Sequence, residues 1–85
     1  MEYNIKEQID IWEKKLHQYE QKKAVLRNRI DKNESLRQQI DKIPVGNPKV
    51  DRFYRYLASL YTQFAALPAK IRHCKDNIQT LKCEL

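Results

Sequence analysis

Apolar residues in the second half of the chain recur at alternating steps of three and four. The series is unbroken at Val50, Phe53, Leu57, Leu60, Phe64, Leu67, Ile71, Cys74, Ile78, Leu81 and Leu85. A β-strand needs a step of two, whereas steps of three and four place side chains along one stripe of an α-helix. The pattern predicts a long helix that buries this stripe, which we call the seam, against another helix.

The first half of the chain carries the same spacing less regularly. Apolar residues lie at Ile5, Ile9, Trp12, Leu16, Tyr19, Leu26, Ile30 and Ile40, with polar Lys23, Asn33 and Arg37 at the intervening seam positions. Asn4 and Glu7 have the spacing of a helix-capping box, which predicts that a helix begins there. Pro44 disfavours helix in the residue before it, so this helix should end near residues 42–43.

The segment 44–48 is the one clear connection, and Asn47 followed by Pro48 is typical of a helix N-cap with proline at the first helical position. We therefore predict an all-α fold, an antiparallel helical hairpin or coiled coil, in a single domain of residues 1–85. Its arms should span about 4–43 and 49–85.

Pro68 interrupts the second arm, and a proline inside a helix removes one backbone hydrogen bond and clashes with the preceding turn. The seam nevertheless passes Pro68 in phase. We predict a kink near residue 68. The alternative is a reversal of the chain there, which would produce a three-helix bundle.

A register for the hairpin follows if opposing seam residues have numbers that sum to 97, as in the pairs Leu16–Leu81 and Ile30–Leu67. Charged residues beside the seam then pair across it. The predicted pairs are Glu13–Lys82, Glu20–Lys75 and Lys15–Glu84.

Residues 53–67 carry apolar or aromatic side chains on more than one helical face, and two helices cannot cover them all. Small residues at Ala58, Ala65 and Ala66 permit close approach of another helix. A chain of 85 residues also has a small core, for which oligomerisation is a common remedy. We expect a homodimer that forms a helical bundle.

The composition suits amphipathic helices, since 33% of the residues are charged and 41% are hydrophobic. No apolar run approaches the roughly 20 residues of a membrane span, and no secretory signal is visible at residues 1–4, so we expect a cytoplasmic protein without a membrane partner. Cys74 and Cys83 lie on one predicted helix, roughly 13 Å apart, which is too far for a disulfide. We expect a buried Cys74 and a more exposed Cys83.

Catalytic motifs are absent: the chain has no Gly-rich phosphate loop, no Gly-x-Ser-x-Gly turn and no two-cysteine metal pair. The outline of a long helix, a Pro-Val turn and a Pro-divided second half resembles the all-helical chorismate mutases, with Ile5-Lys6-Glu7-Gln8-Ile9-Asp10 similar to their opening helix. That resemblance implies that Lys23 binds a substrate carboxylate. The family's Arg-rich constellation is not evident, so we predict no enzyme, no cofactor and no metal site.

The net charge is +6, with seventeen Lys and Arg against eleven Asp and Glu, and such a balance favours acidic partners. We predict a small regulator, adaptor or inhibitor that binds a larger protein, with an acidic surface, through exposed helix faces. Tyr and Arg dominate binding hot spots, so the predicted contacts near the turn are Arg52, Tyr54, Arg55, Tyr56 and Tyr61.

The alternative function is nucleic-acid binding at the basic end of the hairpin, where cationic side chains would contact phosphates and tyrosines would stack on unpaired bases. The candidate residues are Lys42, Lys49, Arg52 and Arg55. The two functions differ in their response to salt, because phosphate contacts weaken steeply as salt is added.

Overall fold

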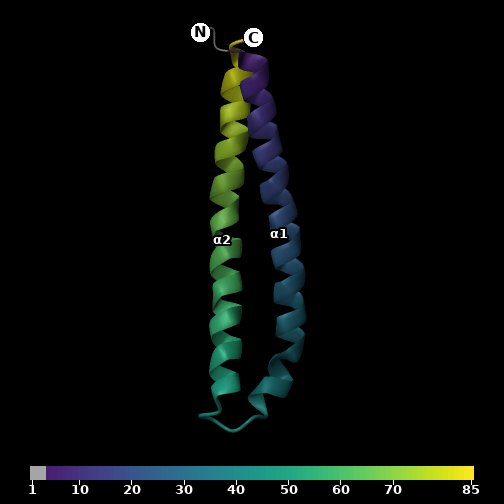
Figure 1. Cartoon of the computed structure of the whole chain (residues 1–85), viewed down its shortest axis with the longest axis vertical. Coiled ribbons are helices and arrows are strands. Elements are labelled where there is room, and N and C mark those ends of the chain that lie inside the picture. Colours follow the sequence, from purple (N-terminus) through teal and green to yellow (C-terminus); the bar gives the residue numbers. More distant parts are fainter. Residues whose placement is uncertain (1–3) are drawn as a thin grey trace.

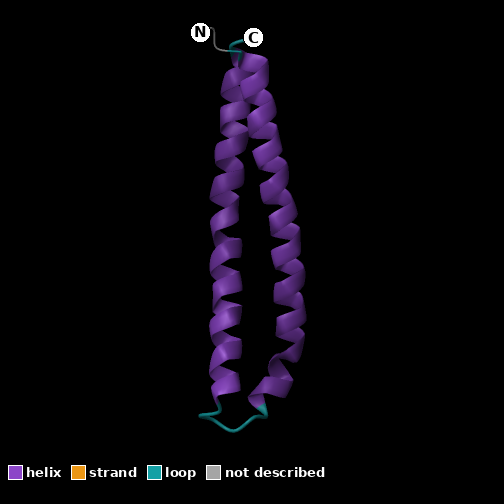
Figure 2. Ribbon diagram, viewed as in Figure 1, coloured by secondary structure: helices purple, strands orange, loops and turns teal. Residues whose placement is uncertain are grey.

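Two antiparallel helices make up the fold (Figure 1). The computed structural model describes residues 4–85, so residues 1–3 of the predicted domain lie outside the described part. Helix α1 spans Ile5–Asp41 and helix α2 spans Pro48–Cys83. No strand occurs among the described residues (Figure 2). The predicted all-α helical hairpin is confirmed.

Both predicted helix starts are present. The backbone N–H of Glu7 donates to Asn4 Oδ1 at 3.3 Å, and that of Lys49 donates to Asn47 Oδ1 at 2.9 Å. Each bond satisfies a backbone donor that the first helical turn leaves unpaired. The connection is 42–47 rather than 44–48, because α1 ends at Asp41 and Pro48 is already helical. Gly46, with φ of +95°, supplies the left-handed residue in this connection.

Helix α2 continues through Pro68 and keeps its direction to Cys83 (Figure 1). The alternative of a chain reversal at residue 68 is therefore wrong. Pro68 is exposed and lies one position outside the seam, so its ring does not interrupt the packing of the two helices. The smaller kink expected at this residue stays a prediction.

The core is a single file of seam side chains between the helices. The buried apolar residues are Ile9, Leu26, Ile30, Leu57, Leu60, Leu67, Cys74 and Ile78, and every one of them is a predicted seam residue. Leu60 and Leu67 are among the most deeply buried side chains, and they pack with Leu26 and Ile30 in one cluster. At about 25 cal/mol per Å² of apolar surface removed from water, this file is the main source of stability.

The predicted register is wrong by one heptad. In that register, Trp12 and His73 lie twelve residues apart along the axis, roughly 18 Å at 1.5 Å per residue. Their ring centroids are in fact 5.4 Å apart. Ile9 was expected beyond the end of the second helix, yet it is buried.

The contacts fit opposing residue numbers that sum to about 90. The cross-helix pairs sum to 85 for Trp12–His73, to 89 for Tyr19–Lys70, and to 95 for Glu34–Tyr61, Asp41–Tyr54 and Glu13–Lys82. Long side chains beside a seam reach a few residues up or down the axis, which accounts for this spread. The two helices then end together, with the start of α1 beside the end of α2 (Figure 1).

The two cysteines behave as predicted. Cys74 is buried in the seam, Cys83 is exposed, and both thiols are free. In the described part of the chain, neither helix has a stretch apolar and long enough to cross a membrane.

Candidate interaction surfaces

The seam divides the hairpin into two flanks with different chemistry. The acidic flank is the row of α1 residues that directly follow one set of seam positions, together with the α2 residues that face them. Its members are Glu13, Glu20, Arg27, Glu34 and Asp41 on α1 and Tyr54, Tyr61, Pro68, Lys75 and Lys82 on α2. Residues at steps of seven share one side of a helix, so this row runs the length of the molecule.

Polar contacts bridge the helices along the acidic flank. The Tyr61 hydroxyl donates to Glu34 Oε1 at 2.6 Å, and the Tyr54 hydroxyl donates to Asp41 Oδ1. Lys82 Nζ lies 4.0 Å from Glu13 Oε1, which is one of the predicted ion pairs. The predicted pairs Glu20–Lys75 and Lys15–Glu84 are not among the ion pairs of residues 4–85.

The contacts of Tyr54 and Tyr61 with carboxylates change the pKa values of the two tyrosine hydroxyls. The hydrogen bond to Glu34 raises the pKa of Tyr61, and the hydrogen bond to Asp41 raises the pKa of Tyr54. The cause is the same at both sites, because a carboxylate that accepts the phenolic proton favours the neutral phenol. Both hydroxyls therefore stay protonated and link α2 to α1 through their hydrogen bonds.

The basic flank lies on the opposite side of the seam. Its cations are Lys15, Lys22, Arg29 and Lys32 on α1 and Lys49, Arg52 and Lys70 on α2. Two contacts locate it: Lys15 Nζ lies 4.6 Å from the Trp12 ring centroid, and Lys70 Nζ lies 5.8 Å from that of Tyr19. Among residues 4–85, Glu84 is the one carboxylate that shares this side, and it lies at the far end of α2.

Within residues 4–85, the cations of the basic flank have no carboxylate partners. The ion pairs among residues 4–85 are Lys14–Asp10, Arg37–Glu34, Arg55–Asp51 and Lys82–Glu13, and none includes a basic-flank residue. Like charges even face each other, because Lys22 and Lys70 occupy opposing positions across the seam. This side of the hairpin is an extended, unneutralised positive surface on a molecule that is 63 Å long.

Exposed apolar side chains gather on the same flank. Ile11 is 45% exposed, Val25 47%, Leu36 44% and Tyr56 48%. The large apolar side chains that are exposed elsewhere in residues 4–85 are Val45 at the turn, Tyr61 on the acidic flank and Leu85 at the end. The basic flank therefore combines positive charge with apolar surface, a composition that fits an anionic partner with apolar groups of its own.

A shallow cavity of about 350 Å³ lies in the groove of the basic flank. Trp12 and Tyr19 from α1 and Ala69 and Cys74 from α2 form its apolar wall, and Lys15, Lys70 and His73 supply its polar lining. The rings of Trp12 and His73 meet edge to face. The cavity can accept one apolar side chain while its lysines meet anionic neighbours of that side chain.

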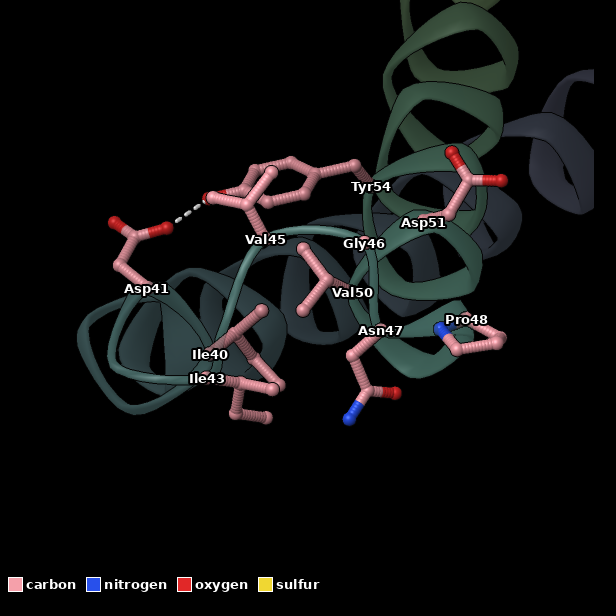
Figure 3. A pocket seen from close by; sticks show the side chains of 10 residues that line it. All are labelled: Ile40, Asp41, Ile43, Val45, Gly46, Asn47, Pro48, Val50, Asp51 and Tyr54. Atoms are coloured by element: carbon pink, nitrogen blue, oxygen red, sulfur yellow. Dashed lines mark hydrogen bonds between the residues drawn. The ribbon is translucent and has the colours of Figure 1, made fainter.

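A second cavity, of about 700 Å³, lies at the turn (Figure 3). Apolar residues contribute much of its lining, namely Ile40, Ile43, Val45 and Val50, although the Val45 side chain is fully exposed. Two carboxylates stand beside it, but Asp41 already accepts from Tyr54 and Asp51 pairs with Arg55 at 3.1 Å. The cavity is an open end of the seam where the chain turns.

The predicted partner contacts do not form one surface. Arg52 and Tyr56 are exposed on the basic flank. Tyr54 and Tyr61 lie on the acidic flank with their hydroxyls bound to α1. Arg55 lies on the outer side of α2.

The residues proposed for nucleic-acid binding are also dispersed. Lys49 and Arg52 belong to the basic flank, whereas Lys42 and Arg55 lie on the outer sides of the two helices. Asp41 and Asp51 line the turn cavity among them. The end of the hairpin is thus mixed in charge, and the uninterrupted positive surface runs along the arms instead.

Other predicted chemistry has little geometry to support it. Among residues 4–85, no group of three or more His, Cys, Asp or Glu side chains could hold a metal ion. Lys23, which the resemblance to chorismate mutases implied as a carboxylate ligand, is half-buried beside Ile71, Arg72 and Asp76. No family model, no curated protein and no solved structure matches this chain.

The predicted sites lie near the turn, so they do not include the cations of α1 that form most of the basic flank. The signal was present in the seven-residue frame. Lys15, Lys22 and Arg29 each precede a seam residue, whereas Glu13, Glu20 and Glu34 each follow one. These two positions lie on opposite sides of a seam, so the acids cannot dilute the basic row.

Proposed function

We propose that this protein is a small non-enzymatic regulator or adaptor that binds an acidic surface on a larger protein through its basic flank. The observation that carries the proposal is the row of seven Lys and Arg side chains without an ion pair, interspersed with exposed apolar residues. Complementary charge steers association and selects partners, while apolar contacts supply affinity. Arg52 and Tyr56 are the predicted contacts that remain in this proposal.

The mechanism is masking. A rigid hairpin 63 Å long covers an extended strip of a partner without needing a catalytic group. A cytoplasmic setting is part of the proposal.

Affinity capture from nuclease-treated extract tests the proposal. The basic-flank variant is Lys15→Glu with Lys70→Glu, and its matched control is Arg27→Glu with Arg72→Glu, which changes the charge equally on the other side of the hairpin. We expect one stoichiometric acidic protein to bind the parent chain and the control and to be lost from the basic-flank variant. Capture that disappears on nuclease treatment would instead favour the nucleic-acid alternative.

We also propose self-association through the outer side of α2. Between Arg55 and Lys70, this side presents Ala58, Thr62, Ala65, Ala66 and Ala69, which are all exposed and uncharged. Small side chains allow helices to approach closely, so a second copy can pack on this side of α2. Light scattering coupled to size exclusion tests this: Ala65→Glu should convert a dimer to a monomer, whereas a monomeric parent chain would refute the dimer.

A further inference from the structure

In residues 4–85, hydrogen bonds and an ion pair bridge the groove between α1 and α2 on one flank, which we call closed, and none bridges it on the other, which we call open. On the acidic flank, Tyr54, Tyr61 and Lys82 reach across to carboxylates of α1. On the basic flank, the cross-helix side-chain contacts among residues 4–85 are the aromatic ones, Trp12–His73 and Lys70 over Tyr19. The acidic flank has a cavity of about 370 Å³ beside Lys23 and Ile71, and the open groove of the basic flank holds the more apolar cavity beside Trp12 and Tyr19.

We infer that this groove seats an acidic amphipathic helix of the partner, which completes a three-helix coiled coil. The inference rests on the proposed function and identifies the kind of structure that is bound. A helix that lies along two others places its apolar residues over their seam and its polar residues beside their flanking positions. Here those flanking positions are cationic, so the matching residues of the incoming helix are Asp and Glu.

Apolar contacts are spaced along the groove for such a helix. Ile11, Val25 and Leu36 lie on one side of α1, and they span roughly 37 Å at 1.5 Å per residue. The Trp12–Tyr19 cavity falls between Ile11 and Val25 and accepts one large apolar side chain of the incoming helix. A partner helix of about 25 residues would reach all of these points.

Two other anionic partners fit less well. A phosphate backbone gains nothing from four exposed apolar side chains beside the cations. A membrane surface requires a continuous apolar face, whereas Ile11 and Val25 are separated by fourteen residues, roughly 21 Å. An amphipathic protein helix uses both the charges and the separated apolar points.

Trp12 provides the measurement, since it is the one tryptophan of the chain and lines the cavity. The probe is a synthetic helix of about 25 residues with leucine at heptad seam positions and glutamate beside them. Its control is a peptide of identical composition in scrambled order, and a DNA duplex is a second control. Each is titrated into the full chain at physiological salt while Trp12 emission is followed.

We expect the patterned peptide to shift Trp12 emission to shorter wavelength and to bind at least about tenfold more tightly than the scrambled one. The Lys15→Glu/Lys70→Glu variant should lose about tenfold or more in affinity, and Arg27→Glu/Arg72→Glu should retain it. Replacing Ile11, Val25 and Leu36 with serine should also weaken the binding of the patterned peptide and leave any binding of DNA unchanged. Circular dichroism of each variant verifies that the hairpin is folded.

Equal binding of the patterned and scrambled peptides would overturn the inference, because plain charge attraction does not depend on order. Absence of binding, or tighter binding of the duplex than of the patterned peptide, would overturn it as well. These results leave the proposed function to its own test: a protein captured through the basic flank would then be recognised by a surface other than an amphipathic helix.

Discussion

The acidic and basic flanks border the same seam but relate to it differently. On the acidic flank, carboxylates of α1 meet tyrosines and a lysine of α2, and the contacts tie the helices together. On the basic flank, lysines face lysines, and no hydrogen bond or ion pair crosses between the helices in residues 4–85. A flank that satisfies its own polar groups serves folding, whereas one that carries unpaired like charges is suited to an external partner.

The difference also indicates how stability and binding are balanced. Exposed ion pairs are worth about 0–1 kcal/mol each, so the basic flank costs the hairpin little. The apolar seam supplies most of the stability and is common to both flanks. Substitutions can therefore separate the seam, the closed flank and the open flank.

The largest expected effect comes from breaking the seam on which both flanks depend. Leu67 is 1% exposed, and Leu67→Ala should lower the free energy of unfolding by about 2–5 kcal/mol through lost burial and a cavity. Urea denaturation followed by circular dichroism measures the loss. Leu36→Ala is the control: this leucine is 44% exposed on the basic flank, so stability should change little while partner binding falls. Equal losses of stability would contradict the assignment of Leu36 to the surface.

Removing Pro68 should have the next largest effect, in the opposite direction. Pro68 lies on the acidic flank of α2, beside Lys23 of α1. Pro68→Ala restores the backbone donor inside α2 and should stabilise the hairpin by about 1–3 kcal/mol. Pro48→Ala is the control, because proline at the first helical position costs nothing. If both variants have the melting temperature of the parent chain, α2 bears no strain at Pro68.

A smaller loss is expected when a cross-helix hydrogen bond of the closed flank is removed. Tyr61→Phe should destabilise the hairpin at pH 7, whereas Tyr56→Phe should not, since Tyr56 makes no side-chain hydrogen bond with the other described residues. The pKa of Tyr61 is raised in the folded state, so the contribution is complete below the unfolded value near 10 and is lost as pH rises through the folded value. Thermal melts across this pH range measure the difference in stability between the parent chain and Tyr61→Phe. A difference that persists at high pH would refute the hydrogen bond.

The smallest change in stability is expected when a carboxylate is placed on the open flank, which makes that flank resemble the closed one. Lys22→Glu places a carboxylate opposite Lys70 and should stabilise the free hairpin by about 0.2–1 kcal/mol. The same change should lower the affinity for the partner. Glu20→Lys, opposite Lys75 on the acidic flank, should do the reverse: a slightly less stable hairpin with unchanged binding. Chemical denaturation and capture of the partner are measured together. A Lys22→Glu variant that binds as the parent does would remove the functional distinction between the flanks.

The sequence by itself determined the helices, the seam and the chemistry of each flank. Every buried apolar residue was predicted from the three–four spacing, since burial along one stripe is a property of a single helix. Asn4, Asn47 and Pro48 identified the helix starts by local hydrogen bonding and backbone geometry. The segregation of Lys22 from Glu20 was equally present in the heptad frame, although mixed composition concealed it.

Only the tertiary structure decided the register and the state of each groove. Sliding one helix by seven residues moves every seam position onto another, so the apolar pattern cannot distinguish sums of 90 and 97. The decision comes from the connection, whose length makes the two helices end together, and from the contact of Trp12 with His73. The grooves were likewise decided by the structure, because the sequence does not show whether Tyr54 and Tyr61 donate to carboxylates of α1 or point into solvent.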